Sequence, residues 1–383
     1  MTHLPIIAIT PGDVAGIGPE VVFHAIRNST VRAACHPLII GDPRILSRVE
    51  KSRTAAGELK FFALPDSLTE RDEIRSAVTQ SASDCVAVIN PCSDKALEVR
   101  PNEVSAVAGD VAYRCLTTAG RMALEGSVDG IATAPLNKMS LHAAGYHYPG
   151  HTEILAEQCG VDEFAMTLYL PESQLKPLRE NVGSRDADAL RTKGHGLSIA
   201  HVTLHTSIAS VPSLLTRDSI AATILLMSNF LKDIGCDRQS IGVAALNPHA
   251  GENGLFGDEE AGLIAPAVNA AKSRGSRVCG PLPADTLIRR AICGEFDAVI
   301  AMYHDQGHIP IKLIGFDAAV NITLGLPIIR TSPTHGTAFD RAWNPETPAD
   351  PAGMIQSVIT AAELCQLSPN RSDSGSRHVA RHR

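Results

Sequence analysis

Short apolar runs recur along the chain, and a turn or a polar segment follows each of them. The runs are residues 6–9, 38–40, 86–89, 130–134, 166–170, 199–204, 244–246 and 298–302. Runs of this length between turns are typical of strands buried on both faces. Residues 20–27 and 106–124 instead carry apolar side chains at helical spacing. Alternating strands and helices predict an α/β fold built on a largely parallel sheet.

Two segments interrupt this pattern because they are polar. Residues 171–196 are charged and rich in turn formers, and they separate two predicted strands. We interpret them as a surface excursion in preference to a lid, since they offer few apolar side chains to close over a ligand. Residues 368–383 are rich in Ser, Arg and His, which favours a disordered tail over a nucleic-acid-binding arm.

Composition narrows the class of protein. The length of 383 residues allows one large or two medium domains. An aromatic content of 4% and a net charge of −7 argue against nucleic-acid binding. There is no apolar run near the ~18 residues of a membrane span, and no basic segment precedes the first apolar run. Nine cysteines without a CxxC pair indicate reduced thiols, so we expect a cytoplasmic protein.

A glycine-rich turn follows the first predicted strand. Its glycines at 12, 16 and 18 do not fit GxGxxG, and no GK[ST] indicates a P-loop. A nucleotide-binding role therefore stays the weaker interpretation. The stronger one is a tight turn whose glycines let a strand and a helix pack closely.

Three histidines follow three predicted strands: His205, His249 and His304. In parallel sheets, ligands gather beyond the carboxyl ends of the strands. Three imidazoles meeting there would hold a metal ion with one position open. Alternatively, each histidine caps its own strand, and the separations of 44 and 55 residues match no short metal-binding motif. Both interpretations stay open on the spacing alone.

Residues 302–340 predict an anion-binding site. Lys312, Asn321 and Arg330 follow one another at intervals of nine residues. Arg offers a bidentate fork to phosphate or carboxylate, and Lys offers a point charge. His151 and Thr152 lie at a predicted helix start, where free N–H groups favour anions. Asp285 is either a general base or ligand, or only the N-cap of the helix that follows it.

Several longer motifs together resemble one family. They are TPGDVAGIGPE at 10–20, APLNK at 134–138, PGHTE at 149–153, LNPHAGENGLFGDEE at 246–260, GPLPADT at 280–286, MYHDQG at 302–307 and VNITLGLPIIRTSPTHGTAFD at 320–340. Over residues 4–365 the chain resembles the 4-hydroxythreonine-4-phosphate dehydrogenase family of pyridoxal phosphate biosynthesis.

The resemblance implies a fold like that of isocitrate and isopropylmalate dehydrogenases. Two α/β/α domains would flank a cleft, in a homodimer with shared active sites, and NAD would bind outside a Rossmann fold. We expect a first domain of residues 1–134 plus about 318–367, and a second of 135–317 that carries the metal ligands and the dimer interface.

The resemblance also implies roles for individual residues. The metal ligands would be His205, His249 and His304, holding one Zn, Mg or Co ion per site. The substrate ligands would be His151, Thr152, Lys312, Asn321 and Arg330, and the loop of His335, Gly336 and Thr337 would face NAD or NADP. Asp285 or Asp305 would accept the hydroxyl proton, with Lys312 beside the reacting groups.

The implied reaction is oxidation of 4-hydroxythreonine 4-phosphate at C3, then decarboxylation to 3-amino-2-oxopropyl phosphate. Two segments depart from the family pattern: residues 341–350 (RAWNPETPAD) and the 171–196 insertion. Short segments such as QGHIPIK resemble paralogous enzymes that act on other acids. A catabolic dehydrogenase for D-threonate or D-erythronate 4-phosphate is therefore the alternative. A catalytically silent metal- or phosphate-binding protein is less favoured, because every matched ligand position is kept.

Overall fold

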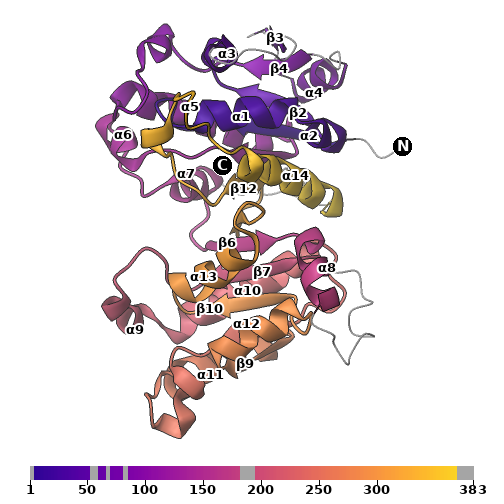
Figure 1. The fold of residues 1–383 in the computed structure, drawn as a ribbon. Helices are drawn as coiled ribbons and strands as arrows, with labels where there is room; N and C mark the ends of the chain where they lie inside the picture. The colour runs from indigo at the N-terminus through magenta and orange to yellow at the C-terminus, as the bar shows by residue number, and fades with distance from the viewer. Residues whose placement is uncertain (1–3, 52–58, 66–69, 81–84, 182–194, 369–383) are drawn as a thin grey trace. The chain divides into compact units, whose positions relative to one another are not determined.

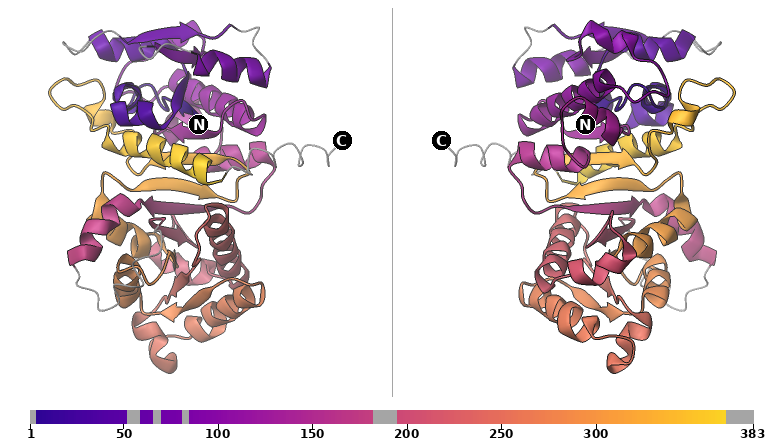
Figure 2. Two further views of the ribbon diagram at one scale, coloured as in Figure 1. Left: turned by 90° about the vertical axis from the view of Figure 1, so that its right-hand side faces the viewer. Right: turned by 90° about the vertical axis from the view of Figure 1, so that its left-hand side faces the viewer.

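The computed structural model describes residues 4–51, 59–65, 70–80, 85–181 and 195–368. The chain divides into two units, one of Met1–Asp162 with Leu326–Arg383 and one of Glu163–Gly325. Each unit is an α/β body with helices on both sides of its strands (Figures 1 and 2). The predicted α/β class is confirmed.

Unit 1 contains a parallel sheet in the order β3-β4-β2-β1-β5-β12. Its strands are β1 (Ile6–Thr10), β2 (His36–Ile40), β3 (Lys60–Ala63), β4 (Cys85–Ile89), β5 (Gly130–Thr133) and β12 (Ile329–Pro333). Its helices are α1 (Gly18–Arg27), α2 (Ser29–Ala34), α3 (Pro43–Lys51), α4 (Arg71–Thr79), α5 (Ala106–Leu124), α6 (Lys138–Ala143), α7 (His151–Cys159) and α14 (Ala352–Leu367). The first and last of these helices, α1 and α14, lie side by side and share one apolar core (Figure 1).

Unit 2 contains a mixed sheet in the order β11-β6-β7-β10-β8-β9. Its strands are β6 (Ala165–Leu170), β7 (Leu197–His201), β8 (Ile241–Ala244), β9 (Val278–Leu282), β10 (Ala298–Ala301) and β11 (Val320–Leu324). Its helices are α8 (Glu172–Asn181), α9 (Val211–Leu214), α10 (Arg217–Asp233), α11 (Ala265–Ser273), α12 (Ala284–Ile292) and α13 (His304–Gly315). Strand β6 runs antiparallel to both neighbours, while β7, β10, β8 and β9 are parallel.

The observed division differs from the predicted boundaries at two places. Residues 135–162 belong to unit 1 because α6 and α7 pack against α5, where a Cβ on Gly109 would lie 2.0 Å from the Ser140 carbonyl oxygen. Residues 318–325 belong to unit 2 because β11 pairs with β6. The stretch 302–340 is therefore divided between the units.

The first part of the 171–196 insertion is a helix, contrary to the expected polar loop. Helix α8 spans Glu172–Asn181, and its Leu175 is fully buried in the core of unit 2. Arg179 Nε also donates to the Ile292 carbonyl at 2.9 Å. The buried leucine and this bond attach a largely polar helix to unit 2. Residues 182–194, and the predicted disordered tail at 369–383, lie outside the described residues.

The glycine-rich turn packs as the tight-turn interpretation predicts. Gly12 has a φ of 65°, and a Cβ there would lie 2.1 Å from the Pro135 carbonyl oxygen. A Cβ on Gly16 would lie 2.8 Å from the Thr337 carbonyl oxygen. Glycine is needed at both positions because backbone from another loop occupies the space.

Within the described residues, no single helix is long and apolar enough to span a membrane. One pair of helical segments, residues 208–214 and 217–233, reaches the required hydropathy only jointly, and it is bent by 91°.

Candidate active site

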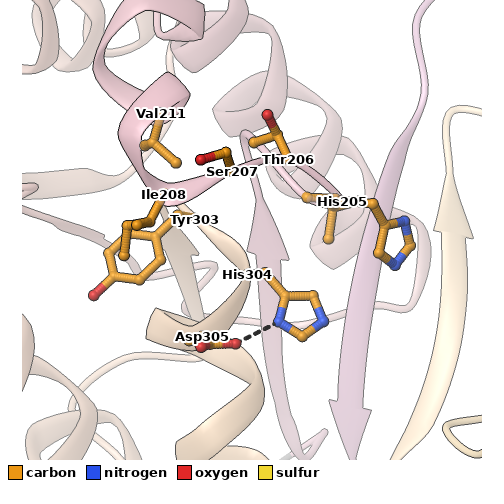
Figure 3. Close-up of a pocket in the computed structure, with 9 residues that line it drawn as sticks. His205, Thr206, Ser207, Ile208, Val211, Tyr303, His304 and Asp305 are labelled. Carbon is orange, nitrogen blue, oxygen red and sulfur yellow. Dashed lines mark hydrogen bonds and ion pairs between the residues drawn. The ribbon is translucent and has the colours of Figure 1, made fainter.

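A pocket lies beyond the carboxyl ends of β7 and β10 in unit 2 (Figure 3). Its volume is about 430 Å³, and its lining is Leu204, His205, Thr206, Ser207, Ile208, Val211, Tyr303, His304 and Asp305. The rings of His205 and His304 lie 5.8 Å apart between centroids. His304 Nδ1 is 2.7 Å from Asp305 Oδ1. Two of the predicted metal ligands and one predicted base thus share one pocket.

The parallel register of β7 and β10 accounts for this convergence. Val202 N donates to the Ala301 carbonyl at 2.9 Å, and the Thr203 N–H and hydroxyl both donate to the Met302 carbonyl. These bonds continue the ladder two residues past the strands. The two loops therefore leave the sheet together, and each delivers one histidine.

The third predicted ligand, His249, lies elsewhere. It follows β8, is exposed, and has its ring 6.2 Å from that of Phe256. Among the residues that the structure describes, no three His, Cys, Asp or Glu side chains of one chain form a metal-binding group. Imidazoles next to a carboxylate are donors that suit Zn²⁺ or Co²⁺. The side chains that line the pocket are therefore of a type that suits such an ion. One chain supplies two of the three predicted imidazoles to this pocket.

Two further histidines lie behind His304. His308 stacks on His304 with ring centroids 3.6 Å apart, and its Nδ1 is 3.2 Å from His201 Nε2. Both are buried, and burial lowers the pKa of His201 to about 3 and that of His308 to about 4. Both rings are neutral at pH 7. Sequence reasoning missed this pair, although the four-residue spacing of His304 and His308 placed them on one helical face.

Lys312 and Asn321 also belong to unit 2. Lys312 is half-buried on α13, with its Nζ 5.7 Å from the Phe316 ring centroid. Asn321 is half-buried on β11, opposite Leu168 of β6.

A second group of predicted residues lies in unit 1, around Arg330. This side chain of β12 is 5% exposed, and its Nε and Nη2 donate to Thr133 Oγ1 at 3.2 and 2.8 Å. Burial lowers the pKa of Arg330 to about 10, so it stays charged at pH 7. Burial, followed by the Arg330 charge, lowers the pKa of the neighbouring His151 well below its usual value. The positive charge in this group is therefore that of Arg330.

His151 and Thr152 begin α7, as the sequence predicts. Gly150 is the N-cap, and Gly160 ends the helix in the left-handed conformation with a φ of 63°. Thr133 was not predicted, because one threonine at the end of an apolar strand carries no distinctive signal.

The predicted cofactor loop follows β12 in the same unit. The Thr337 carbonyl accepts from Ile17 N at 3.0 Å, so the loop is tied to the glycine-rich turn. His335 Nδ1 lies 3.1 Å from the Gly336 carbonyl oxygen. His335 Nε2 is buried and has no hydrogen-bond partner among the described residues. An orphaned donor or acceptor of this kind fits a bound polar group such as a dinucleotide.

Comparison with known proteins now decides the family. Residues 33–361 match the family described as pyridoxal phosphate biosynthetic protein PdxA. The chain belongs to this family. A D-threonate 4-phosphate dehydrogenase from Pectobacterium atrosepticum is 40% identical over 94% of this chain and 99% of its own length. A 4-hydroxythreonine-4-phosphate dehydrogenase from Trichlorobacter lovleyi is 39% identical over 95% of this chain and 98% of its own.

A solved structure agrees with these sequences. The 4-hydroxythreonine-4-phosphate dehydrogenase of Klebsiella pneumoniae has a TM-score of 0.79 and 38% identity, and the match covers 94% of this chain and 99% of that one. The relatives of this PdxA-family chain are therefore dehydrogenases.

The two aspartates predicted as bases have different surroundings in this PdxA-family chain. Asp285 is exposed in the first turn of α12, and its Oδ1 accepts from Thr286 N at 2.8 Å. Asp305 lines the pocket beside His304. The geometry favours Asp305 as the group nearer the histidines.

Proposed function

We propose that the chain is an NAD(P)-dependent, metal-dependent dehydrogenase of 4-hydroxythreonine 4-phosphate. It would oxidise the substrate at C3 and release CO₂, giving 3-amino-2-oxopropyl phosphate for pyridoxal phosphate biosynthesis. The observation that carries this proposal is the pocket in which His205 and His304 face one another beside Asp305.

The metal ligands would be His205 and His304 of one chain, with His249 from a second copy in a homodimer. A divalent ion bound there lowers the pKa of a coordinated hydroxyl and stabilises negative charge that develops next to it. Because Asp305 pairs with Nδ1 of His304, the Nε2 lone pair is the one left for a metal.

Asp305 would have a second task during oxidation. One of its oxygens orients His304, and the other can take the proton of the substrate hydroxyl. The exposed position of Asp285, in contact with its own helix backbone, supports this choice.

The substrate anions would be held by Arg330, with Lys312 and Asn321 as further ligands. Arg330 is charged, buried and oriented by Thr133, so its guanidinium would offer a fixed positive charge to a phosphate or carboxylate. His335, Gly336 and Thr337 would contact NAD or NADP.

A catabolic role on D-threonate 4-phosphate is the second candidate. Similarity to enzymes of that name, at 40% identity over nearly the whole chain, favours it. The two acids differ at C2, where one carries an amino group and the other a hydroxyl. Their C3 hydroxyls and 4-phosphates are shared, so the same pocket chemistry serves both.

The test is reduction of NAD⁺ and NADP⁺ with each phosphorylated acid, in the presence of Zn²⁺, Mg²⁺ or Co²⁺. We expect the highest kcat/KM with 4-hydroxythreonine 4-phosphate, and at least about tenfold less with D-threonate and D-erythronate 4-phosphates, since a site built to bond one group leaves polar atoms unpaired with another. A reversed order would assign the catabolic role. No reduction with any of these acids would contradict both.

A further inference from the structure

The loop that carries His249 has a left-handed backbone over five consecutive residues. The φ values are 52° at His249, 55° at Ala250, 77° at Gly251, 41° at Glu252 and 57° at Asn253. L-residues avoid this conformation because Cβ approaches the following carbonyl oxygen, and only one of the five is glycine. Such a segment persists only where neighbouring groups over-determine it.

Glu260 supplies the contacts at the start of this loop. It is 5% exposed and begins a π-helical turn, Glu260–Ile264. Its Oε1 accepts from Leu246 N at 2.9 Å and from Asn247 N at 2.8 Å. Its Oε2 accepts from Asn247 Nδ2 at 3.0 Å. One carboxylate thus fixes two successive peptide groups just before His249.

The same carboxylate also fills the inside of the turn. A Cβ on Gly251 would lie 2.7 Å from Glu260 Oε2, so the turn closes around the carboxylate only with glycine at this position. Phe256 N donates to the Gly251 carbonyl at 3.2 Å, which closes the loop behind it.

The start of the loop is also hydrogen-bonded to helix α13, which begins at His304, through Gln306. Gln306 Oε1 accepts from Met302 N, and Gln306 Nε2 donates to the Ala245 carbonyl, both at 2.7 Å. Ala245 is therefore bonded to α13 through Gln306, and Leu246 and Asn247 are bonded to Glu260 through their N–H groups. The direction in which the chain leaves β8 follows from these two side chains.

We propose that Glu260 is a positioning residue that holds His249 in the orientation needed to bind a metal ion. It acts through the backbone of residues 246–251 and touches neither metal nor substrate. This inference rests on the proposed function, because it takes His249 to be a metal ligand.

The experiment is titration of the full-length, metal-stripped protein with Co²⁺, followed by calorimetry and by the visible absorption of bound Co²⁺. The variants are Glu260→Asp, Glu260→Gln and, as matched control, Glu259→Gln. Glu259 Oε2 accepts from the side chain of the same Asn247 at 2.7 Å. Glu260→Asp keeps the charge and loses the reach to two N–H groups, so we expect affinity to fall roughly 10- to 100-fold. Glu260→Gln can keep an oxygen on the two N–H groups but loses the acceptor for Asn247 Nδ2, so its Co²⁺ affinity should fall less than that of Glu260→Asp. The control should stay within about threefold of the parent.

A double variant of Glu260 and His249 distinguishes positioning of His249 from a general contribution of Glu260 to folding. If Glu260 acts on His249, Glu260→Asp should add no loss of Co²⁺ affinity in a His249→Ala background. If Glu260→Asp folds poorly, Gly251→Ala takes its place, because the added methyl group would push into the Glu260 carboxylate. We expect this variant to lose Co²⁺ affinity to a similar degree.

Three results have different meanings. Unchanged Co²⁺ binding by Glu260→Asp and Gly251→Ala, with weakened binding by His249→Ala, would overturn this inference alone. Fully additive losses in the double variant would also overturn it. Unchanged binding by His249→Ala would remove the metal role from the proposed function itself.

Discussion

At the scale of the residue, the surroundings of His304 define what the pocket can do. Asp305 lies at its Nδ1, the neutral ring of His308 stacks on its face, and His205 lies across the pocket. These contacts hold the imidazole in one orientation, in which Nδ1 is occupied and Nε2 is the nitrogen proposed to bind the metal ion. Orientation of this kind is what a metal-binding histidine requires from its neighbours.

Replacement of His304 tests this assignment. His304→Ala should abolish metal retention and reduce turnover by at least about 10³-fold, a loss of about 4 kcal/mol in transition-state stabilisation. Metal content by emission spectrometry and steady-state rates are the measurements. His147→Ala, an exposed histidine of unit 1, is the control. Metal retained at parental content in the His304 variant would refute the role.

Arg330 gives a second prediction at this scale. Arg330→Ala should lower kcat/KM for phosphorylated substrates about 10- to 100-fold, because a charged hydrogen bond is worth roughly 1.5–3 kcal/mol. The exposed Arg114→Ala should change nothing. Since the guanidinium loses its proton only as pH rises through about 10, its contribution should be constant between pH 6 and 9. A parental KM and kcat/KM in the Arg330 variant would contradict the anion assignment.

The sequence could identify residues with distinctive chemistry, but not the side chains that orient them through hydrogen bonds. His205, His304 and Arg330 were candidates because their side chains can bind a metal ion or an anion, and the family resemblance then implied their roles. Thr133 and Gln306 could not, because a threonine or glutamine becomes informative only when its bonding partner is known. The resemblance implied active sites shared between subunits, but the left-handed turn that carries His249 has no signal in the sequence.

At the scale of the element, the apolar pattern predicted strands such as β1, β5 and β10, but it missed β3, β9, β11, β12 and helix α8. Strands β1, β5 and β10 are buried along their whole length, so each appears as an uninterrupted apolar run. Helix α8 is largely polar and is docked by Leu175. A single anchor leaves no periodic signal in ten residues.

The docking of α8 is testable by stability. Leu175→Ala should lower the free energy of unfolding by about 2–5 kcal/mol, because it removes a fully buried side chain and leaves a cavity. Lys176→Ala, exposed on the same helix, should cost less than about 0.5 kcal/mol. Urea unfolding measures both. Equal midpoints for the two variants would show that α8 contributes nothing to the core.

At the scale of the whole molecule, the predicted site residues form two groups. Unit 2 holds His205, His304, Asp305, Lys312 and Asn321, and unit 1 holds Arg330, His151 and the loop at residues 335–337. The 302–340 stretch contributes to both, since the chain passes from β11 of unit 2 to β12 of unit 1 within it. Unit 2 thus carries two of the predicted metal ligands with Asp305, and unit 1 carries Arg330 and the predicted cofactor loop.

The central claim is that one site couples oxidation at C3 to loss of CO₂ and needs a metal ion for it. The direct measurement is the yield of reduced nicotinamide and of CO₂ from 4-hydroxythreonine 4-phosphate, before and after metal removal with a chelator. We predict equal amounts of both products with Zn²⁺, Mg²⁺ or Co²⁺ restored, and neither without metal. Reduced nicotinamide without CO₂, or full turnover in the metal-free protein, would contradict the account.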